Sequence, residues 1–430
     1  MELLLRNARV IDPANNIDQV QDIGIANGAF ADPTSLAAPT VVNVEGLLLA
    51  PGFIDLHVHL RDPGQTHKET LATAAAAAAA GGFTTIVAMP NTSPPIDRED
   101  ALRDVLARAA AFPEIRILQT ATLSAARHGR ELANFATLRD AGAPALTDDG
   151  GCLDNARLMR DAMLQAKEVG LPVLDHCEDA SLAEGTVAYQ SATARALNLP
   201  ARSRVAEELV VARDILLAEE TACPVHIQHV STRRSVELIR HARAQGLPVT
   251  AEVTPHHLVL THEACRDFGT LAKVNPPLGD EQDRQALIEA ARDGTISAIA
   301  TDHAPHTLEE KQAGWRRAPF GIAGLETVVP VCCTELVHGG VFTWRRLVEL
   351  FTTGPAAVLG LQAGTLTPGA PADCTILDPE AKSVLKPDEF VSKGKNTPFA
   401  GKKCRGRALG TIRNGEPSAT LRQRLRNPTQ

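Results

Sequence analysis

The chain has 430 residues and a formal net charge of −8 at pH 7. This length is enough for one large domain plus a smaller one, with a sizeable buried core. The modest negative charge, with no basic stripe, argues against nucleic acid as a partner. The N-terminal MELLLRNARVID has charged residues on both sides of its leucines, unlike a signal peptide, and the apolar LATAAAAAAAGGF is far shorter than a bilayer span. We therefore expect a cytoplasmic protein that does not associate with a membrane.

Eight cysteines are scattered singly, apart from the adjacent Cys332 and Cys333, and no C-x-x-C motif occurs. This spacing argues against a disulfide scaffold and against a zinc site built from thiolates. We expect reduced thiols that pack as small apolar side chains.

Between residue 52 and about residue 302, short apolar runs typical of strands alternate with stretches of helical spacing. Several helical stretches begin with Asp or Asn and end with Gly, as capped helices do. Eight strands that alternate with helices favour a parallel (β/α)8 TIM barrel of the α/β class over an open sheet. The candidate strands, in chain order, are GFIDLHVHL, TTIVAMP, IRILQTATL, APALTD, LPVLDHC, CPVHIQHV, LPVTAEVT and ISAIATD.

The two ends of the chain differ from this pattern and consist of strand-like runs separated by turns rich in Gly, Pro and Asn. Neither end is long enough for a convincing core by itself. We expect residues 1–51 and 362–430 to pair into one small β-sandwich-like domain, beside a barrel domain that spans residues 52–361.

The stretch DLHVHLRDPG places His57 and His59 two residues apart on the first barrel strand. Side chains alternate along a strand, so both imidazoles point to the same face, and Arg61 follows them if the extended geometry persists. Near the C-terminal rim of a barrel, two such imidazoles can bind one metal ion, and Arg61 can meet an anionic part of a substrate. An H-x-H motif alone is a weak signal, because ordinary strand histidines also produce it.

Later strands strengthen the metal interpretation, because His176, His229 and Asp302 follow the fifth, sixth and eighth candidate strands. Imidazole and carboxylate ligands without thiolate suit Zn²⁺ in a catalytic site with open positions. The fourth strand ends in ALTDDGG, where Asp148 or Asp149 could bridge two metals, and the spacing does not decide between them.

Other histidines have weaker signals. His256 and His257, at the rim of the seventh strand, could contact substrate or metal directly or could support the site through hydrogen bonds. His226 precedes His229 by three positions, so strand alternation predicts that it faces outward, as a packed or surface residue. His303 would point away from its neighbour Asp302, and the polar segment between His306 and Phe320 could form a mobile lid.

Taken in order, ten segments resemble the dihydroorotase family, in its long bacterial form, within the amidohydrolase superfamily. The resemblance covers nearly the whole chain, and the combination is specific where a single segment would not be. The segments are PGFIDLHVHLRDPG, GGFTTIVAMPNTSPP, TDDGG, DHCED, HVST, TPHHL, KVNPPL, ATDHAPH, FGIAGLET and SKGKNTPF.

This resemblance implies a role for each residue and a cofactor of one or two Zn²⁺ ions per subunit. His57 and His59 would bind a first metal, and His176 and His229 a second. Asp149 would bridge them, while Asp302 would contact the first metal and act as acid and base. The substrate would be held by Arg61, Asn91, Asn275, His306, Phe320 and Gly321.

The implied reaction is the reversible cyclisation of N-carbamoyl-L-aspartate to L-dihydroorotate and water, a step of pyrimidine synthesis. In the hydrolytic direction, a metal-bound hydroxide would attack the ring amide. The resemblance also implies a homo-oligomer and a possible complex with aspartate carbamoyltransferase.

Two alternatives stay open. Allantoinases and hydantoinases act on similar rings, but they bridge their metals with a carbamylated lysine on the fourth strand, and APALTDDGG contains no lysine. A shorter aspartate would hold the metals differently, which leaves occupancy of the second position open. The other alternative is a non-catalytic relative that serves as a partner of aspartate carbamoyltransferase.

Overall fold

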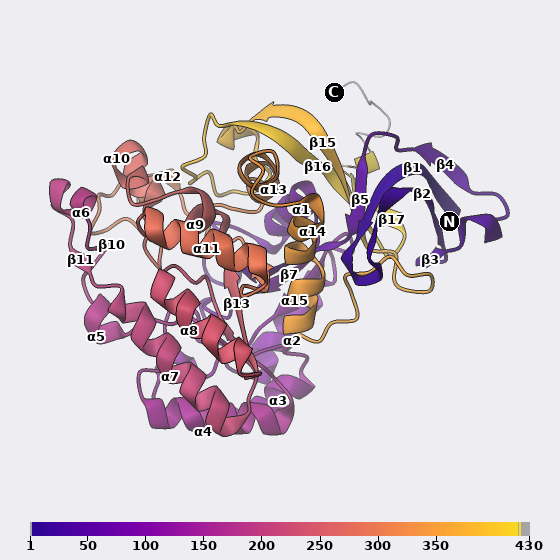
Figure 1. Cartoon of the computed structure of the whole chain (residues 1–430). Helices are drawn as coiled ribbons and strands as arrows, with labels where there is room; N and C mark the ends of the chain where they lie inside the picture. The colour runs from indigo at the N-terminus through magenta and orange to yellow at the C-terminus, as the bar shows by residue number, and fades with distance from the viewer. Residues whose placement is uncertain (1, 420, 423–430) are drawn as a thin grey trace.

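Parallel strands form a ring at the centre of the computed structural model, which describes residues 2–419, 421 and 422 (Figure 1). The ring consists of a three-stranded sheet and a four-stranded sheet, with the strand orders β6-β7-β8 and β14-β13-β12-β9. Its strands are β6 (Phe53–Val58), β7 (Phe83–Ala88), β8 (Arg116–Gln119), β9 (Val173–Asp175), β12 (Val225–Ile227), β13 (Val249–Val253) and β14 (Ala298–Ile299).

Short bridges join the two sheets into a barrel. On one side, Val58 pairs with His303 in parallel. On the other side, Leu146 pairs with both Ala121 and Val173. The predicted strand APALTD is therefore wrong as a regular strand, because its pairing is confined to Leu146; Pro144 within it has no N–H to donate. The segment nevertheless occupies the fourth position of the predicted (β/α)8 barrel.

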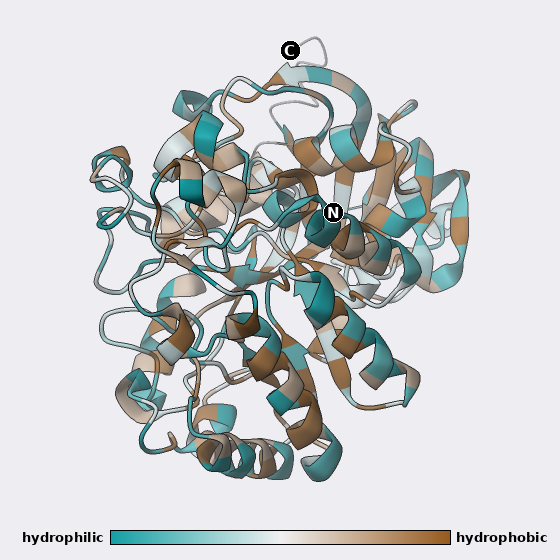
Figure 2. Cartoon of the chain, turned by 60° about the vertical axis from the view of Figure 1, so that its left-hand side comes forward, coloured by the Kyte–Doolittle hydropathy of each residue, from teal (hydrophilic) through white to brown (hydrophobic). Residues whose placement is uncertain are grey.

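Helices surround the ring, and Figure 2 shows hydrophilic and hydrophobic residues on different sides of several of them. The predicted caps are present: α4 begins after Asn155 and ends at Gly170, and α11 begins after Asp280 and ends at Gly294. The surrounding helices are α1 (Leu71–Gly81), α2 (Glu99–Ala109), α3 (Phe135–Asp140), α4 (Ala156–Val169), α7 (Val205–Thr221), α8 (Arg233–Ala244), α11 (Glu281–Asp293), α14 (Trp344–Phe351) and α15 (Thr353–Val358).

The alanine run forms α1, whose small side chains let it lie close to its neighbours. Thr70 caps its first turn, and a Cβ at Gly81 would lie 2.1 Å from the carbonyl oxygen of Leu325. Only glycine fits this contact without a shift of the backbone.

Short elements extend the loops that leave the barrel strands. They are α5 (Ala180–Ala183), β10 (Ala188–Tyr189), α6 (Ala192–Ala196), β11 (Ala201–Arg202), α9 (Pro255–Val259), α10 (Ala264–Phe268), α12 (Leu308–Lys311) and α13 (Val328–Cys332). Single turns of 3₁₀-helix cover Pro13–Asn15, Pro33–Ser35, Ala125–Arg127, Gly269–Ala272 and Pro387–Glu389, and a π-helical turn covers Cys333–Val337.

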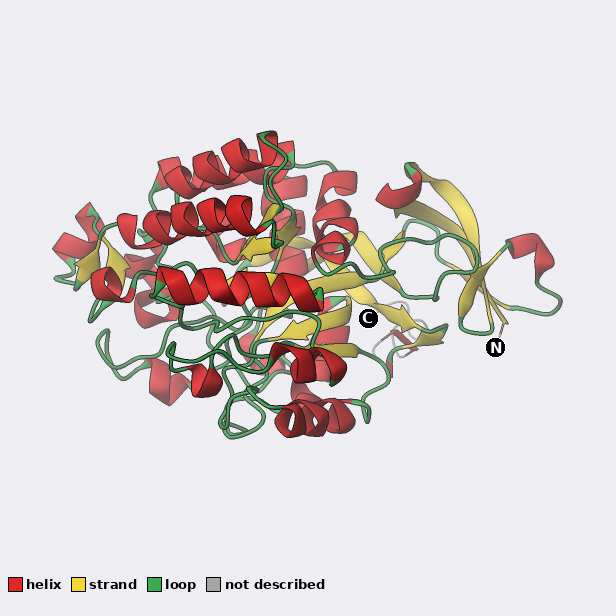
Figure 3. Ribbon diagram, turned by 90° about the horizontal axis from the view of Figure 1, so that it is seen from below, coloured by secondary structure: helices red, strands yellow, loops and turns green. Residues whose placement is uncertain are grey.

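The two chain ends form one eight-stranded sheet beside the barrel (Figure 3). The strand order is β17-β16-β15-β5-β1-β2-β3, and β4 pairs with β1. The strands are β1 (Glu2–Asp12), β2 (Ile17–Ala26), β3 (Ala29–Ala31), β4 (Thr40–Asn43), β5 (Leu48–Pro51), β15 (Cys374–Val384), β16 (Lys403–Arg413) and β17 (Glu416–Pro417).

This sheet has its own apolar core, which includes Leu5 and Ile412. Leu377 and Ala408, from β15 and β16, belong instead to the large core of the barrel. The division into domains at residues 51/52 and 361/362 stays a prediction.

All eight cysteines are free thiols, and all but Cys152 are buried, as expected. None of the helices in the described part of the chain is long and apolar enough to cross a membrane.

Candidate active site

A cavity of about 310 Å³ opens where the carboxyl ends of the barrel strands meet. Every predicted site residue except His57 lines it, and His57 lies fully buried beside Asp149. The volume falls at the lower end of the range for small-molecule sites. The barrel therefore brings residues from distant parts of the sequence to one rim, as predicted.

The Asp149 carboxylate lies at the centre of the four histidines. Its Oδ1 is 3.2 Å from His57 Nε2, 3.5 Å from His176 Nδ1 and 3.6 Å from His229 Nε2. Its Oδ2 is 3.5 Å from His59 Nε2. One carboxylate thus faces both histidine pairs.

Asp302, after β14, faces the first of these pairs. Its Oδ1 lies 3.1 Å from His59 Nε2 and 3.7 Å from His57 Nε2. Burial opposes ionisation of Asp302, but the neighbouring imidazoles outweigh burial and lower the pKa of its carboxyl. Asp302 is therefore an anion at neutral pH and can accept a proton.

The donor set fits divalent metal ions. His57 Nε2 is buried, has no hydrogen-bond partner and lies beside two carboxylates. Two groups of ligand atoms, each within 4.8 Å of one another, share Asp149: one contains His57 and His59, and the other contains His176 and His229. Nitrogen and oxygen donors at this spacing suit a pair of cations around a shared carboxylate.

The electrostatics agree with this arrangement. Burial lowers the pKa of His57, but Asp149 and Glu252 outweigh it and raise that pKa well above its usual range. Burial likewise opposes ionisation of Asp149, but the imidazoles lower its pKa well below the usual value. The site therefore stabilises positive charge next to its carboxylates.

The geometry separates the two aspartates of TDDGG. The Asp148 carboxylate turns away from the histidines and accepts hydrogen bonds from the N–H groups of Leu123 and Ser124, at 2.9 and 3.1 Å. Asp149 alone of the two reaches the histidines. Asp148 thus ties the loop after β8 to the segment that carries Asp149.

Several site residues have left-handed backbone. The φ angles of Arg61, His229 and Asp302 are 59°, 32° and 45°. Non-glycine residues adopt this region at a cost, and such residues are common at functional sites. Extended geometry ends before each of these residues, so strand alternation cannot place their side chains.

His226 is a residue whose direction strand alternation did not predict correctly. The expectation that it faces outward is wrong, because β12 ends at Ile227 and the chain changes conformation before His229. The His226 ring is buried and lies 3.2 Å from Glu252 Oε2 through its Nε2.

Glu252, on β13, is a site residue that sequence reasoning missed. Its Oε1 lies 2.8 Å from His57 Nδ1, so it fixes the orientation of that ring and leaves Nε2 to face the carboxylates. Such a carboxylate behind a ligand histidine is a common support for metal binding. A charged residue within the apolar run LPVTAEVT is the only signal that the sequence offered.

Arg61 provides a half-buried cation at the mouth of the cavity. Burial lowers the pKa of Arg61 to about 10, so the guanidinium stays charged at neutral pH. Its Nε donates to the Pro305 carbonyl at 3.3 Å, and its Nη2 lies 3.1 Å from His306 Nε2. Among the residues that the structure describes, Arg61 has no carboxylate partner within 4.0 Å.

Asn91 and Asn275 contact opposite histidine pairs. Asn91 Oδ1 lies 2.9 Å from His59 Nδ1, and Asn275 Nδ2 lies 3.1 Å from His176 Nε2. Arg202, which sequence reasoning also missed, donates to Asn275 Oδ1 at 2.6 Å. Both amides therefore border the cavity and also orient the imidazoles.

The backbone at Phe320–Gly321 is largely engaged within the protein. The Phe320 carbonyl lies 2.9 Å from His306 Nε2, and the Gly321 N–H donates to the Lys273 carbonyl at 2.9 Å. The Gly321 carbonyl accepts from Lys311 Nζ at 3.0 Å. A Cβ at Gly321, where φ is 124°, would lie 2.4 Å from the Ala304 side chain, so glycine is required.

The strand-seven histidines lie behind the cavity wall. His257 bonds through Nδ1 to Thr254 Oγ1 at 2.7 Å and through Nε2 to the Pro276 carbonyl at 3.0 Å. His256 is buried next to it, and neither residue lines the cavity. Of the two possibilities, the structure favours support through hydrogen bonds for His257.

A third group of potential metal ligands, formed by Asp175, Cys177 and Asp214, lies outside this cavity. Arg213 Nη2 already pairs with Asp214 Oδ1 at 2.7 Å and lies 3.4 Å from Asp175 Oδ2. The guanidinium compensates these carboxylates, so the group is a structural ion-pair cluster.

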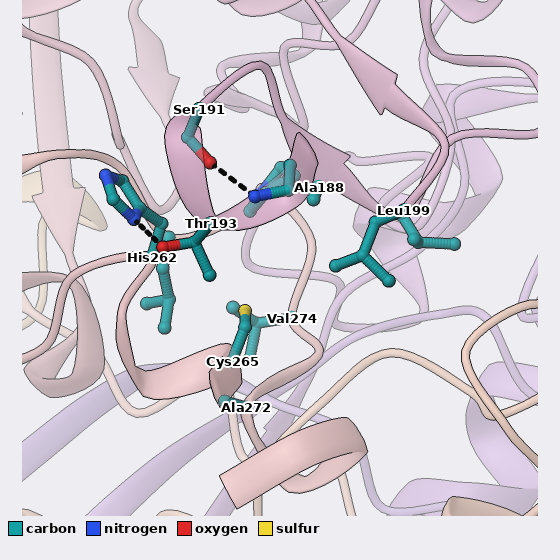
Figure 4. Close-up of a pocket in the computed structure, with 12 residues that line it drawn as sticks. Ala188, Ser191, Thr193, Leu199, His262, Cys265, Ala272 and Val274 are labelled. Carbon is teal, nitrogen blue, oxygen red and sulfur yellow. Dashed lines mark hydrogen bonds between the residues drawn. The ribbon is translucent and has the colours of Figure 1, made fainter. Parts of the chain in front are cut away.

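Another hollow lies between Leu199, Cys265 and Val274 (Figure 4). Its volume of about 10 Å³ is at the limit for a single water molecule. It is a packing gap and cannot hold an organic substrate.

Comparisons with known proteins agree on one family. Residues 46–235 match the family described as Dihydro-orotase-like. The chain is 42% identical to a dihydroorotase from Aquifex aeolicus, and the match covers 97% of this chain and 99% of the relative. It is 46% identical to a dihydroorotase from Geobacillus kaustophilus over 91% of each chain, and 47% identical to one from Bacillus caldolyticus over 87% and 88%.

Solved structures of related hydrolases share the whole fold. An L-hydantoinase (dihydropyrimidinase) from Arthrobacter aurescens matches with a TM-score of 0.87 and 25% identity, over 96% of this chain and 95% of that chain. A dihydropyrimidinase from Brevibacillus agri matches with a TM-score of 0.84 and 24% identity, over 97% and 95%. The dihydroorotases are much more similar to this chain in sequence, at 42–47% identity, than these structural neighbours are, at 24–25%. The chain therefore belongs to the dihydroorotase family of cyclic-amide hydrolases.

Proposed function

We propose that this site interconverts L-dihydroorotate and N-carbamoyl-L-aspartate, with one or two Zn²⁺ ions as cofactor. The observation that carries the proposal is the half-buried guanidinium of Arg61, which has no carboxylate partner among the described residues and lines the same cavity as the histidine and aspartate cluster. A substrate that carries both a ring amide and a carboxylate would place one group at the cluster and the other at Arg61. The forked guanidinium can bind a carboxylate through two parallel hydrogen bonds.

The four histidines and Asp149 would hold the metal, with Asp302 beside the first position. A bound divalent cation would lower the pKa of water to about 7 and polarise the ring carbonyl. The absence of thiolate among these ligands supports zinc in a catalytic role, with open positions for water and substrate.

Asp302 would carry the proton. In the hydrolytic direction, a water oxygen bonds to the carbonyl carbon of the ring, and Asp302 Oδ1 accepts the proton that the water loses. The carbon–nitrogen bond of the ring then breaks, and Asp302 delivers this proton to the departing nitrogen. In the closing direction the same carboxylate removes a proton from the ureido nitrogen.

The part of the substrate ring that points away from the histidine and aspartate cluster would lie between two walls of the cavity. Asn275 and the Phe320–Gly321 backbone form these walls, and His306 and Asn91 lie near Arg61 and His59. Burial, followed by the charge of Arg61, lowers the pKa of His306 to about 2, so its ring is neutral. A neutral ring beside Arg61 leaves the guanidinium as the cation available to the substrate carboxylate.

A substrate panel tests the proposal. We expect hydrolysis of L-dihydroorotate, and closure of N-carbamoyl-L-aspartate, to exceed the turnover of hydantoin, allantoin and dihydrouracil, none of which carries a carboxylate on its ring. Arg61→Met should remove this preference. Equal turnover of all four rings by the unaltered protein would contradict the assignment and favour a hydantoinase-like activity.

Self-association is supported by an apolar stripe on α7. Val205, Leu209 and Leu216 are 46%, 52% and 65% exposed and lie on one face of that helix. We propose that this face contacts a second copy of the chain. Light scattering should show smaller particles for Leu209→Glu with Leu216→Glu than for the unaltered protein, and an unchanged mass would exclude this face.

Two further expectations concern a protein partner and the location in the cell. A complex with aspartate carbamoyltransferase is tested by analytical ultracentrifugation of the two proteins mixed at equal concentration. A cytoplasmic location is supported by the eight free thiols, which persist in a reducing compartment.

A further inference from the structure

Lys311, the last residue of α12, is a lysine with no exposed surface. Its Nζ donates to three backbone carbonyls: those of Pro319 at 2.9 Å, Gly321 at 3.0 Å and Lys273 at 3.1 Å. Among the described residues, no carboxylate oxygen lies within 4.0 Å of this ammonium. A buried lysine that pairs only with carbonyls is costly, so its position needs a reason.

The three carbonyls belong to the two walls of the substrate cavity. Pro319 and Gly321 flank Phe320, and Lys273 lies two residues before Asn275 on the opposite wall. The walls also touch directly, because the Gly321 N–H donates to the same Lys273 carbonyl at 2.9 Å. Lys311 therefore cross-links both walls at a single point behind the cavity.

The number of donors matches the number of acceptors. An ammonium group has three N–H donors, and Lys311 uses one for each carbonyl. A neutral amine has two, so one of the three carbonyls would lose its hydrogen bond to Lys311 and would face the nitrogen lone pair. The cross-link is complete only in the protonated form.

Two neighbouring side chains also support this junction, and one of them, Lys273, likewise spans both walls. Lys273 Nζ donates to the carbonyls of Trp315 and Ala318, both at 2.6 Å. Asn396, from the loop between β15 and β16, donates to the Gly321 carbonyl at 3.1 Å. Lys273 reaches residues 315 and 318 through its side chain, whereas Lys311 joins the Lys273 carbonyl to the carbonyls on both sides of Phe320.

We propose that Lys311 is a positioning residue for this reaction: its ammonium sets the distance between the Asn275 wall and the Phe320–Gly321 wall, and so the fit of the substrate ring. The inference rests on the proposed function, because it assumes that the ring lies between these walls. Lys311 does not line the cavity, so it acts through the backbone that it binds.

Titration of Lys311 gives the proposal a pH signature. Burial, followed by the charge of Lys273, lowers the pKa of Lys311 to about 7. Two nearby titratable groups do not compensate this charge. The His306 ring, whose pKa is lowered in part by Lys311, stays neutral, and the Glu310 carboxylate pairs with Lys68 at 3.1 Å. Above pH 7 the KM for dihydroorotate should therefore rise as the ammonium is lost.

The test compares Lys311→Met with Lys167→Met in the full-length, zinc-loaded protein. Lys167 also donates to one backbone carbonyl, that of Thr221 at 2.9 Å, but it lies on α4, away from the cavity. We expect Lys311→Met to raise KM about 10-fold to 100-fold, because small displacements of binding groups are costly, with a smaller change in kcat. Lys167→Met should leave both constants unchanged.

The rise of KM between pH 7 and 9 should be present in the unaltered protein and absent in Lys311→Met. An unchanged KM in folded Lys311→Met with its full metal content would overturn the proposal, as would an identical pH profile. If the unaltered protein turned over no dihydroorotate at all, the proposed function itself would fail, which is a distinguishable result.

A second measurement covers the case in which Lys311→Met does not fold. Hydrogen exchange of the 312–321 amides in the unaltered protein, corrected for the intrinsic rate, should lose protection between pH 6 and 8.5. The amides of α11 serve as the control. Constant protection of the 312–321 segment across this range would contradict the proposal.

Discussion

His59 Nε2 lies 3.1 Å from Asp302 Oδ1, although 243 positions of the sequence separate the two residues. This contact joins the first and the last strand of the barrel at the rim. It places the proposed proton carrier beside an imidazole of the first ligand pair.

Replacing Asp302 with asparagine removes the proton acceptor and keeps the shape of the side chain. Positioned acid–base groups contribute about 10²-fold to 10⁴-fold to a rate, so we expect kcat to fall by a factor in this range. Steady-state kinetics measures the loss, and metal content with circular dichroism serves as the control. Full activity in Asp302→Asn would exclude Asp302 from the mechanism.

Replacing Arg61 with lysine keeps the charge but removes the fork. Hydrogen bonds to charged groups contribute roughly 1.5–3 kcal/mol, so we expect KM to rise about 10-fold to 100-fold, with a smaller change in kcat. The dependence of rate on dihydroorotate concentration provides the measurement. If KM did not change, Arg61 would not be the carboxylate-binding group.

Glu252→Gln tests the support behind His57. The glutamine keeps the size of the side chain but loses the charge that orients the ring through the 2.8 Å contact with Nδ1. Loss of such a support costs about 10-fold to 100-fold in metal affinity. Competition with a chromophoric chelator measures that affinity, and an unchanged value would show that Glu252 only fills space.

Deprotonation of Lys311 should change stability and activity in opposite directions: as the pH rises, the free energy of unfolding should increase while substrate binding weakens. Its pKa is about 7 in the folded protein, below the usual 10.5, so the unfolded chain binds more protons between these values. The contribution of this group to the free energy of unfolding therefore rises with pH over that range. Relative to Lys311→Met, the unaltered protein should gain about 2 kcal/mol between pH 7 and 9. Urea unfolding at both pH values measures this gain, and a constant difference between the proteins would contradict the burial of a charged Lys311.

Much of the fold and of the histidine and aspartate cluster could be predicted, because these features depend on short local patterns. Strand alternation placed His57 and His59 on one face, and the carboxyl ends of parallel strands meet at one rim, which brought in His176 and His229. Spacing alone left Asp148 and Asp149 open, because adjacent residues in a turn have no fixed alternation. The family resemblance favoured Asp149, and the structure places the Asp149 carboxylate among the histidines.

Other features could not be predicted from such patterns. The left-handed backbone at His229 interrupts the strand alternation from which His226 was expected to face outward. Glu252 was missed because no second polar residue follows it on the strand at a spacing that would mark a metal site. Lys311 lies in the polar run TLEEKQAGWRRAP, where a lysine normally faces solvent. Its burial results from backbone carbonyls 8, 10 and 38 positions away, which a pattern of side chains does not reveal.

Removal of the metal tests the central claim most directly, that four imidazoles and two carboxylates act through a bound divalent cation. The measurement is the hydrolysis of L-dihydroorotate by protein treated with a chelator, together with elemental analysis before and after treatment. We predict one or two zinc ions per chain in the active protein, loss of turnover as they are removed, and recovery when Zn²⁺ is added back. Full-rate opening of the ring by metal-free protein would contradict the account.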